Sequence, residues 1–113
     1  VIDIRNYNDY VNGHIPGAYL SSLATLLDDL ATTIPSHRPY VVACYTGQTA
    51  GHAKIAMELL GHGDVYSLLF GMAAWNRSLS SPWNANVGDL LAAVPFLETD
   101  QTDAVHVRQW CKL

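Results

Sequence analysis

The chain has 113 residues, of which half are hydrophobic and 14% are charged, with a formal net charge of −4. That length supports one compact core rather than two. Low charge with high apolar content argues against a disordered chain. The few cationic side chains are scattered along an acidic sequence, which argues against nucleic acid and anionic membrane surfaces as partners. No apolar run approaches the ~20 residues that span a bilayer, so no membrane insertion is expected in this segment.

Strand and helix signals alternate in the first third of the chain. β-Branched runs indicate short strands, leucines at helical spacing indicate an amphipathic helix, and a Pro-Gly pair indicates a turn. In chain order the expected elements are a strand over 1–4, a helix over 6–12, a turn over 14–17, a strand over 18–20 and a helix over 22–32. Asn6, with Asp9 three residues further on, is the expected N-cap of the first helix, and Gly13 is its stop.

The alternation continues after a loop bracketed by Pro35 and Pro39. The next expected elements are a strand over 40–43, a helix over about 50–60, a strand over 65–69 and a short helix over 71–75. Thr49 is a candidate N-cap of the middle helix, and Lys54 and Glu58 are spaced to pair on its surface. The apolar face of that helix is predicted to carry Ala53, Ala56, Met57 and Leu60. This alternation predicts parallel strands joined by crossover helices, and hence an α/β fold.

The rhythm changes after Arg77. The successive parts are a turn-rich stretch at 78–86, a helix signal at 88–94 and a polar, acidic stretch at 98–103. We interpret residues 79–113 as a C-terminal appendage packed on the same domain. Trp83 and Trp110 are expected to pin it there by burial.

The two cysteines, Cys44 and Cys111, do not make a disulfide framework. The five histidines show no ligand spacing with either cysteine, so no metal site is predicted. Cys111 is interpreted as an unreactive tail residue, with a resolving thiol as the alternative.

Cys44 stands where an apolar strand gives way to a polar, glycine-containing loop that leads into a helix. Ligands of open α/β sheets gather at the carboxyl ends of strands, and a helix N-terminus presents unpaired N–H groups and a partial positive charge. Such donors favour the thiolate, which is the nucleophilic form of cysteine. Gly47 lets the loop curl, while Thr46, Gln48 and Thr49 add polar groups. Cys44 is therefore a candidate nucleophile, and the alternative is a small core residue.

Four short blocks in one order carry a resemblance to the rhodanese family. They are Val1-Ile2-Asp3-Ile4-Arg5, Gly13-His14-Ile15-Pro16-Gly17-Ala18, Val41 to Ala50 around Cys44, and Gly71-Met72-Ala73-Ala74-Trp75. They resemble the family's Asp-x-Arg strand, its Gly-His-Ile-Pro-Gly-Ala turn, its active-site loop and its closing Gly-Met-x-x-Trp element. The resemblance covers residues 1–78, which we take as the rhodanese-like domain. It implies three layers, with a central, mainly parallel sheet and helices on both faces, and the single-domain bacterial type.

The resemblance implies a sulfurtransferase in which Cys44 accepts a sulfane sulfur from a donor such as thiosulfate. The resulting persulfide passes the sulfur to a thiophilic acceptor, a thiol or cyanide, by double displacement. The loop residues Tyr45, Thr46, Gly47, Gln48 and Thr49 would bind the substrate, and their amides would stabilise the thiolate and the outer sulfur. No cofactor is implied.

The loop departs from the family pattern in its charge. Many members carry Arg directly after the cysteine, where this chain has Tyr45, and others carry a cation near the loop's end, where Thr49 stands. An uncharged loop is expected to bind the thiosulfate dianion loosely, so another sulfane carrier or a protein persulfide is an alternative donor.

The family's opening strand and helix are absent upstream of Val1, so an N-terminal extension or targeting segment is expected to precede it. Similar members with this loop and a trailing Trp-Asn element look like exported bacterial proteins, which favours the periplasm. The cytoplasm stays open.

Four further residues of the matching blocks have supporting roles in this interpretation. Asp3 and Arg5 lie two apart on one side of a strand, where we expect a structural network bracing the turn at 14–18, with tuning of the site as the alternative. His14 is expected to hydrogen-bond backbone beside that turn, although a proton shuttle is the other reading. Trp75 is interpreted as a core anchor, although the family places this residue close to the active-site rim.

Two rival functions follow from the same residues. A cysteine phosphatase or arsenate reductase needs Arg at the sixth position after the nucleophile, where this chain has Ala50, so that function is rejected. The second rival is a catalytically idle rhodanese module that binds a partner or senses redox state. The presence of Cys44 argues against it, and the uncharged loop keeps it open.

Overall fold

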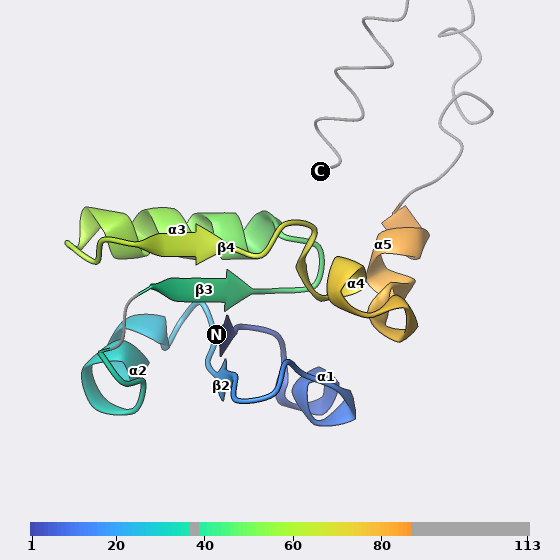
Figure 1. Ribbon diagram of the computed structural model, residues 1–113, viewed down its shortest axis with the longest axis horizontal. Helices are drawn as coiled ribbons and strands as arrows, with labels where there is room; N and C mark the ends of the chain where they lie inside the picture. The colour runs from blue at the N-terminus through green and yellow to red at the C-terminus, as the bar shows by residue number, and fades with distance from the viewer. Residues whose placement is uncertain (37–38, 87–113) are drawn as a thin grey trace, which may run out of the picture.

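A computed structural model of the chain describes residues 1–36 and 39–86, and the sheet within them has four strands in the order β2-β1-β3-β4. The strands are β1 (Ile2–Asp3), β2 (Tyr19–Leu20), β3 (Tyr40–Ala43) and β4 (Val65–Ser67). All three pairings are parallel, and β1 and β3 are the inner strands (Figure 1). The structure thus confirms the predicted α/β class.

Within the described residues, one helix follows each strand, and two further helical segments come after the fourth helix. They are α1 (Tyr7–Asn12), α2 (Leu26–Thr32), α3 (Gln48–Leu59), α4 (Gly71–Trp75), the 3₁₀ helix η1 (Arg77–Leu79) and α5 (Ser81–Asn86). Figure 1 shows α4 beyond the ends of the β3 and β4 arrows, on the same side as the loop that joins β3 to α3. The carboxyl ends of the two strands therefore face α4.

Alternate residues of β3 serve opposite faces of the sheet. Val42 belongs to a core cluster that includes Leu26 of α2 and Met57 of α3. Ala43 packs in a second cluster with Met72 of α4, against which Tyr10 of α1 is also packed. The sheet consequently lies between two helical layers, as the resemblance implied.

Helix α1 begins and ends as the sequence predicted. The Asn6 side-chain oxygen accepts a hydrogen bond from the Asp9 N–H at 2.9 Å, which satisfies a donor of the first helical turn. At the other end, the Gly13 N–H donates to the carbonyl oxygens of Asp9 and Tyr10. These contacts define the two ends of α1.

The predicted starts of α2 and α3 were wrong. Helix α2 begins at Leu26, not at residue 22, because the Ser22 hydroxyl bonds the Thr25 hydroxyl and N–H and closes a separate turn first. Helix α3 begins at Gln48, and its N-cap is Gly47 rather than Thr49. Glycine fits there because the backbone φ is +99°, a left-handed conformation that side-chain-bearing residues rarely adopt.

The surface of α3 only partly follows its predicted apolar face. Ala53 and Met57 are buried as expected, whereas Leu60 is exposed beyond the end of the helix. Lys54 and Glu58 form the predicted ion pair, with the Lys54 Nζ 2.6 Å from a Glu58 carboxylate oxygen. Two leucines of the expected α2 pattern, Leu23 and Leu27, are also exposed.

The segment after α4 is helical rather than turn-rich, which corrects the expectation for residues 78–86. Its first turn is η1, where the Asn76 side chain accepts from the Ser78 N–H. Trp83 of α5 packs edge-on against Phe70, with ring centroids 5.5 Å apart, so this part of the predicted appendage contacts the domain. The predicted helix at 88–94, Trp110 and Cys111 lie outside the described residues.

Candidate active site

Cys44 directly follows β3 and lies at the carboxyl end of an inner strand. Its position in the alternation of β3 places it on the same face as Val42, and only 3% of its surface is exposed. The sulfur is thus shielded by the fold, as a small core residue would be. Its polar contacts distinguish it from one.

Two backbone N–H groups point to the Cys44 sulfur. The Gly47 N–H donates to Sγ at 3.1 Å and the Ala50 N–H donates to it at 3.4 Å. Both donors belong to the cap and first turn of α3, where N–H groups lack a partner within the helix. Hydrogen bonds and the positive end of the helix both favour negative charge on the sulfur. This arrangement can hold a nucleophilic thiolate in a buried place.

The loop that the sequence predicted runs from Tyr45 into the first turn of α3. Thr46 and Gly47 are half-buried, whereas Gln48 and Thr49 are exposed on the first turn of α3. A methyl group on Gly47 would come within 3.2 Å of the Phe70 nitrogen, so the loop passes close to the backbone before α4. The loop after β3 is therefore packed against the segment that follows β4.

Helix α4 holds the other side of the loop through backbone hydrogen bonds. The Met72 N–H donates to the Cys44 carbonyl oxygen at 2.8 Å, and the Ala73 N–H donates to the Tyr45 carbonyl oxygen at 3.0 Å. Gly71 makes this approach possible because a Cβ on it would overlap the Cys44 carbonyl oxygen and lie 2.7 Å from the Tyr45 carbonyl carbon. The sequence indicated α4, but not that α4 fixes the loop.

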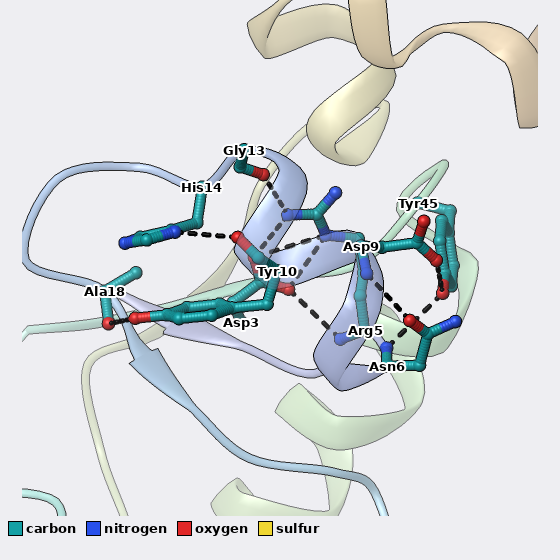
Figure 2. A network of polar contacts seen from close by, with 9 residues as sticks. All are labelled: Asp3, Arg5, Asn6, Asp9, Tyr10, Gly13, His14, Ala18 and Tyr45. Atoms are coloured by element: carbon teal, nitrogen blue, oxygen red, sulfur yellow. Dashed lines mark hydrogen bonds and ion pairs between the residues drawn. The ribbon is translucent and has the colours of Figure 1, made fainter.

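The side chain of Tyr45 extends from the loop to α1 (Figure 2). Its hydroxyl donates to an Asp9 carboxylate oxygen at 2.6 Å and accepts from the Asn6 N–H at 3.3 Å. Burial raises the pKa of the Tyr45 phenol, and the hydrogen bond to the Asp9 carboxylate raises it further. The phenol therefore stays protonated and keeps donating at neutral pH.

Asp3 and Arg5 form a buried ion pair. The Arg5 Nη2 lies 2.7 Å from an Asp3 carboxylate oxygen and donates to the Gly13 carbonyl oxygen at 2.6 Å. Gly13 directly precedes the turn at 14–18, so the predicted bracing network is present. The guanidinium carbon of Arg5 also lies 5.9 Å from the centre of the Tyr45 ring, which links this network to the loop.

The structure bears out the expected backbone contact of His14 but not the expected burial of Trp75. His14 stacks on Tyr10 at 3.8 Å between ring centroids, and its Nδ1 is 2.8 Å from the Tyr10 carbonyl oxygen, the expected kind of backbone contact. Trp75 is not a core anchor: 53% of its surface is exposed. As the last residue of the five-residue helix α4, it lies past the buried positions Gly71 and Met72.

Sequence reasoning missed the part that Asp9 plays at the site. Acidic residues are common in the first turn of a helix, where they complement the helix dipole. The position of Asp9 was therefore already explained by the stability of α1, and it gave no sign of a contact with the active-site loop. Nothing in the sequence spacing related it to Tyr45, 36 residues away.

Within residues 1–36 and 39–86, no group of three or more His, Cys, Asp or Glu side chains is arranged to hold a metal ion. Over the same ranges, none of the helices has the length and apolar character needed to cross a membrane.

Fold and site together define a class of parallel α/β domains that present a cysteine to loop amides at the end of an inner strand. A family model for the rhodanese-like domain matches residues 1–78. The chain belongs to the rhodanese-like domain family, and it is a rhodanese-type sulfurtransferase.

Relatives and a solved structure agree with this assignment. The thiosulfate sulfurtransferase GlpE of Shewanella oneidensis is 36% identical over 78 residues, which cover 69% of this chain and 76% of the relative. The protein of the same name from Pseudomonas fluorescens is 35% identical, covering 69% and 71%. The crystal structure of a rhodanese-like domain protein from Staphylococcus aureus superposes with a TM-score of 0.59 at 27% identity, over 66% of this chain and 72% of that one.

Proposed function

We propose that the chain transfers a sulfane sulfur through a persulfide on Cys44. The single observation that carries this proposal is the pair of N–H donors from Gly47 and Ala50 on the Cys44 sulfur. They stabilise the thiolate before the reaction and the negative charge that forms on sulfur during it. The relatives' activity as thiosulfate sulfurtransferases supports thiosulfate as a donor for this chain too.

The reaction has two displacements that balance in atoms and electrons. The Cys44 thiolate attacks the outer sulfur of thiosulfate, the sulfur–sulfur bond of the donor breaks, and sulfite leaves with the bonding electron pair. Cyanide or a thiolate acceptor then attacks the outer sulfur of the persulfide. The Cys44 thiolate leaves with its electron pair, ready for the next cycle. Residues Tyr45 to Thr49 form the binding loop.

The natural donor is proposed to be less charged than thiosulfate. No side chain of the loop carries a charge, while the Asp9 carboxylate lies on the Tyr45 hydroxyl at its edge. Arg5, whose guanidinium lies 5.9 Å from the centre of the Tyr45 ring, is already paired with Asp3. Amides alone compensate a dianion weakly, which favours a persulfide on a small thiol or a protein as the donor, with a thiol as acceptor.

The experiment that tests the mechanism is the intact mass of the protein after treatment with thiosulfate. We expect a gain of one sulfur atom, located on the peptide that contains Cys44, and loss of that mass when cyanide is added. Protein that gains no sulfur from thiosulfate or from a small persulfide would refute the proposal. Sulfur found only on the Cys111 peptide would refute the assignment of Cys44.

A cation in the loop is expected to improve the use of thiosulfate. For Thr46→Arg we expect the KM for thiosulfate to fall about fivefold, the effect of one partly exposed charge contact. Steady-state rates at low and high salt measure this, because salt screens the added contact. Thr46→Gln is the control for side-chain size and is expected to leave KM unchanged. An equal fall in both variants would contradict the charge argument.

A further inference from the structure

The hydroxyl of Tyr45 connects the active-site loop to a different layer of the fold. Tyr45 directly follows Cys44, yet its hydroxyl ends on α1, 2.6 Å from an Asp9 carboxylate oxygen and 3.3 Å from the Asn6 nitrogen (Figure 2). A charge-assisted hydrogen bond of this length is stronger than one between neutral groups. The contact joins two residues that are 36 positions apart, one in α1 and the other in the loop after β3.

The α1 end of this connection is itself held in place. The Asp9 N–H donates to the Asn6 side chain at 2.9 Å, so the two residues that meet the phenol are also hydrogen-bonded to each other. Arg5 also faces the Tyr45 ring, and its guanidinium is held by Asp3 and by the Gly13 carbonyl oxygen. The phenol therefore docks on a preformed polar surface rather than on mobile side chains.

The Tyr45 backbone is held independently by α4. The Ala73 N–H donates to the Tyr45 carbonyl oxygen, and the Met72 N–H donates to the Cys44 carbonyl oxygen. With its backbone on α4 and its side chain on α1, Tyr45 is fixed from two directions. The donors to the sulfur, Gly47 and Ala50, follow two and five residues later, so the orientation of Tyr45 affects where they point.

We propose that Tyr45 and Asp9 form a positioning pair, which sets the direction of the active-site loop and thereby the reactivity of Cys44. The inference rests on the proposed function of Cys44 as the nucleophile. In this proposal, Tyr45 and Asp9 act only through the position of the loop and take no part in the bond-making and bond-breaking steps. Both hydrogen-bonding groups are partly accessible to water, so losing their contact leaves few unsatisfied groups and costs little stability. The effect is expected in rates instead.

The test compares the pair with a matched tyrosine on α1. Tyr45→Phe and Asp9→Ala each remove the contact, whereas Asp9→Asn keeps an acceptor oxygen. Tyr10→Phe is the control, because it removes another tyrosine hydroxyl, one that donates to the Ala18 carbonyl oxygen far from Asp9 in the network. For each variant we measure the rate at which iodoacetamide alkylates the Cys44 peptide, kcat and KM for thiosulfate, and Tm.

We expect Tyr45→Phe and Asp9→Ala to slow alkylation and lower kcat about tenfold each, with KM changed less than about twofold. Tm should stay within about 3 °C of the wild type. The double variant should lose no more than either single one, since the two groups share one contact. Asp9→Asn should recover most of the rate, and Tyr10→Phe should keep it.

Wild-type alkylation rates in Tyr45→Phe and Asp9→Ala would overturn the proposal, as would additive losses in the double variant. The proposal would also be overturned if Tyr10→Phe lost as much rate as Tyr45→Phe and Asp9→Ala and all three variants had a lower Tm. That pattern would reflect general destabilisation. Failure of the wild type to transfer sulfur would count against the proposed function alone. The alkylation rates would still decide whether the pair positions the loop.

Discussion

Replacement of Cys44 by serine is expected to lower the rate of sulfur transfer by at least about three orders of magnitude. A serine hydroxyl can still accept hydrogen bonds from the Gly47 and Ala50 N–H groups, so the loop has no reason to change shape. The hydroxyl is a far weaker nucleophile at neutral pH than a thiolate and forms no persulfide, so the covalent route is lost. Production of thiocyanate from thiosulfate and cyanide measures the rate.

The matched control for that substitution is Cys111→Ser, which changes the other cysteine of the chain in the same way. We expect it to keep the wild-type rate, since the proposed mechanism needs a single thiol. Urea unfolding should show that Cys44→Ser stays within about 2 kcal/mol of the wild type. Equal, background rates in the wild type and Cys44→Ser would instead favour a catalytically idle module.

The sequence predicted those parts of the site that depend on neighbours along the chain. The strand β3 was predicted with its observed bounds, because an apolar run ends abruptly at a polar loop. The helix α4 was also predicted with its observed bounds, and the cap of α1 at Asn6 follows from side-chain chemistry within four residues. Cys44 as the candidate nucleophile came from the same local reading, strengthened by the rhodanese resemblance.

The parts that sequence reasoning missed depend on contacts between distant segments. Thr49 was a reasonable N-cap by residue type, yet α3 begins earlier because the left-handed backbone of Gly47 turns the loop at that point. Trp75 has the size of a core anchor, but at the end of α4 it lies past the buried Gly71 and Met72 and stays 53% exposed. The contact between Asp9 and Tyr45 has no local signature, since it exists only once α1 is placed beside the loop.

Sequence reasoning also missed the close approach of Gly71 to the backbone of Cys44 and Tyr45. Gly71→Ala is expected to lower the free energy of unfolding by about 2–5 kcal/mol. The backbone φ of +59° disfavours a side chain, and the added Cβ would overlap the Cys44 carbonyl oxygen. Relief of that overlap moves α4 away from the loop and weakens the bonds from Met72 and Ala73. The free energy of unfolding, measured with urea, and kcat should therefore fall together.

Two other glycines separate the causes of this loss. Gly17 also has a positive φ, of +80°, but nothing lies within 4 Å of the place of its Cβ, so Gly17→Ala should cost only the conformational strain of about 1–2 kcal/mol. Gly51 has ordinary helical backbone inside α3 and the same open space, so its change to alanine should be neutral or stabilise by up to about 1 kcal/mol. If Gly71→Ala proved no more costly than Gly17→Ala and kept its kcat, close packing of α4 on the Cys44 carbonyl would not be what holds the loop. A larger loss at Gly71, with normal rates in the other two, would attribute the geometry of the sulfur site to that one contact between backbones.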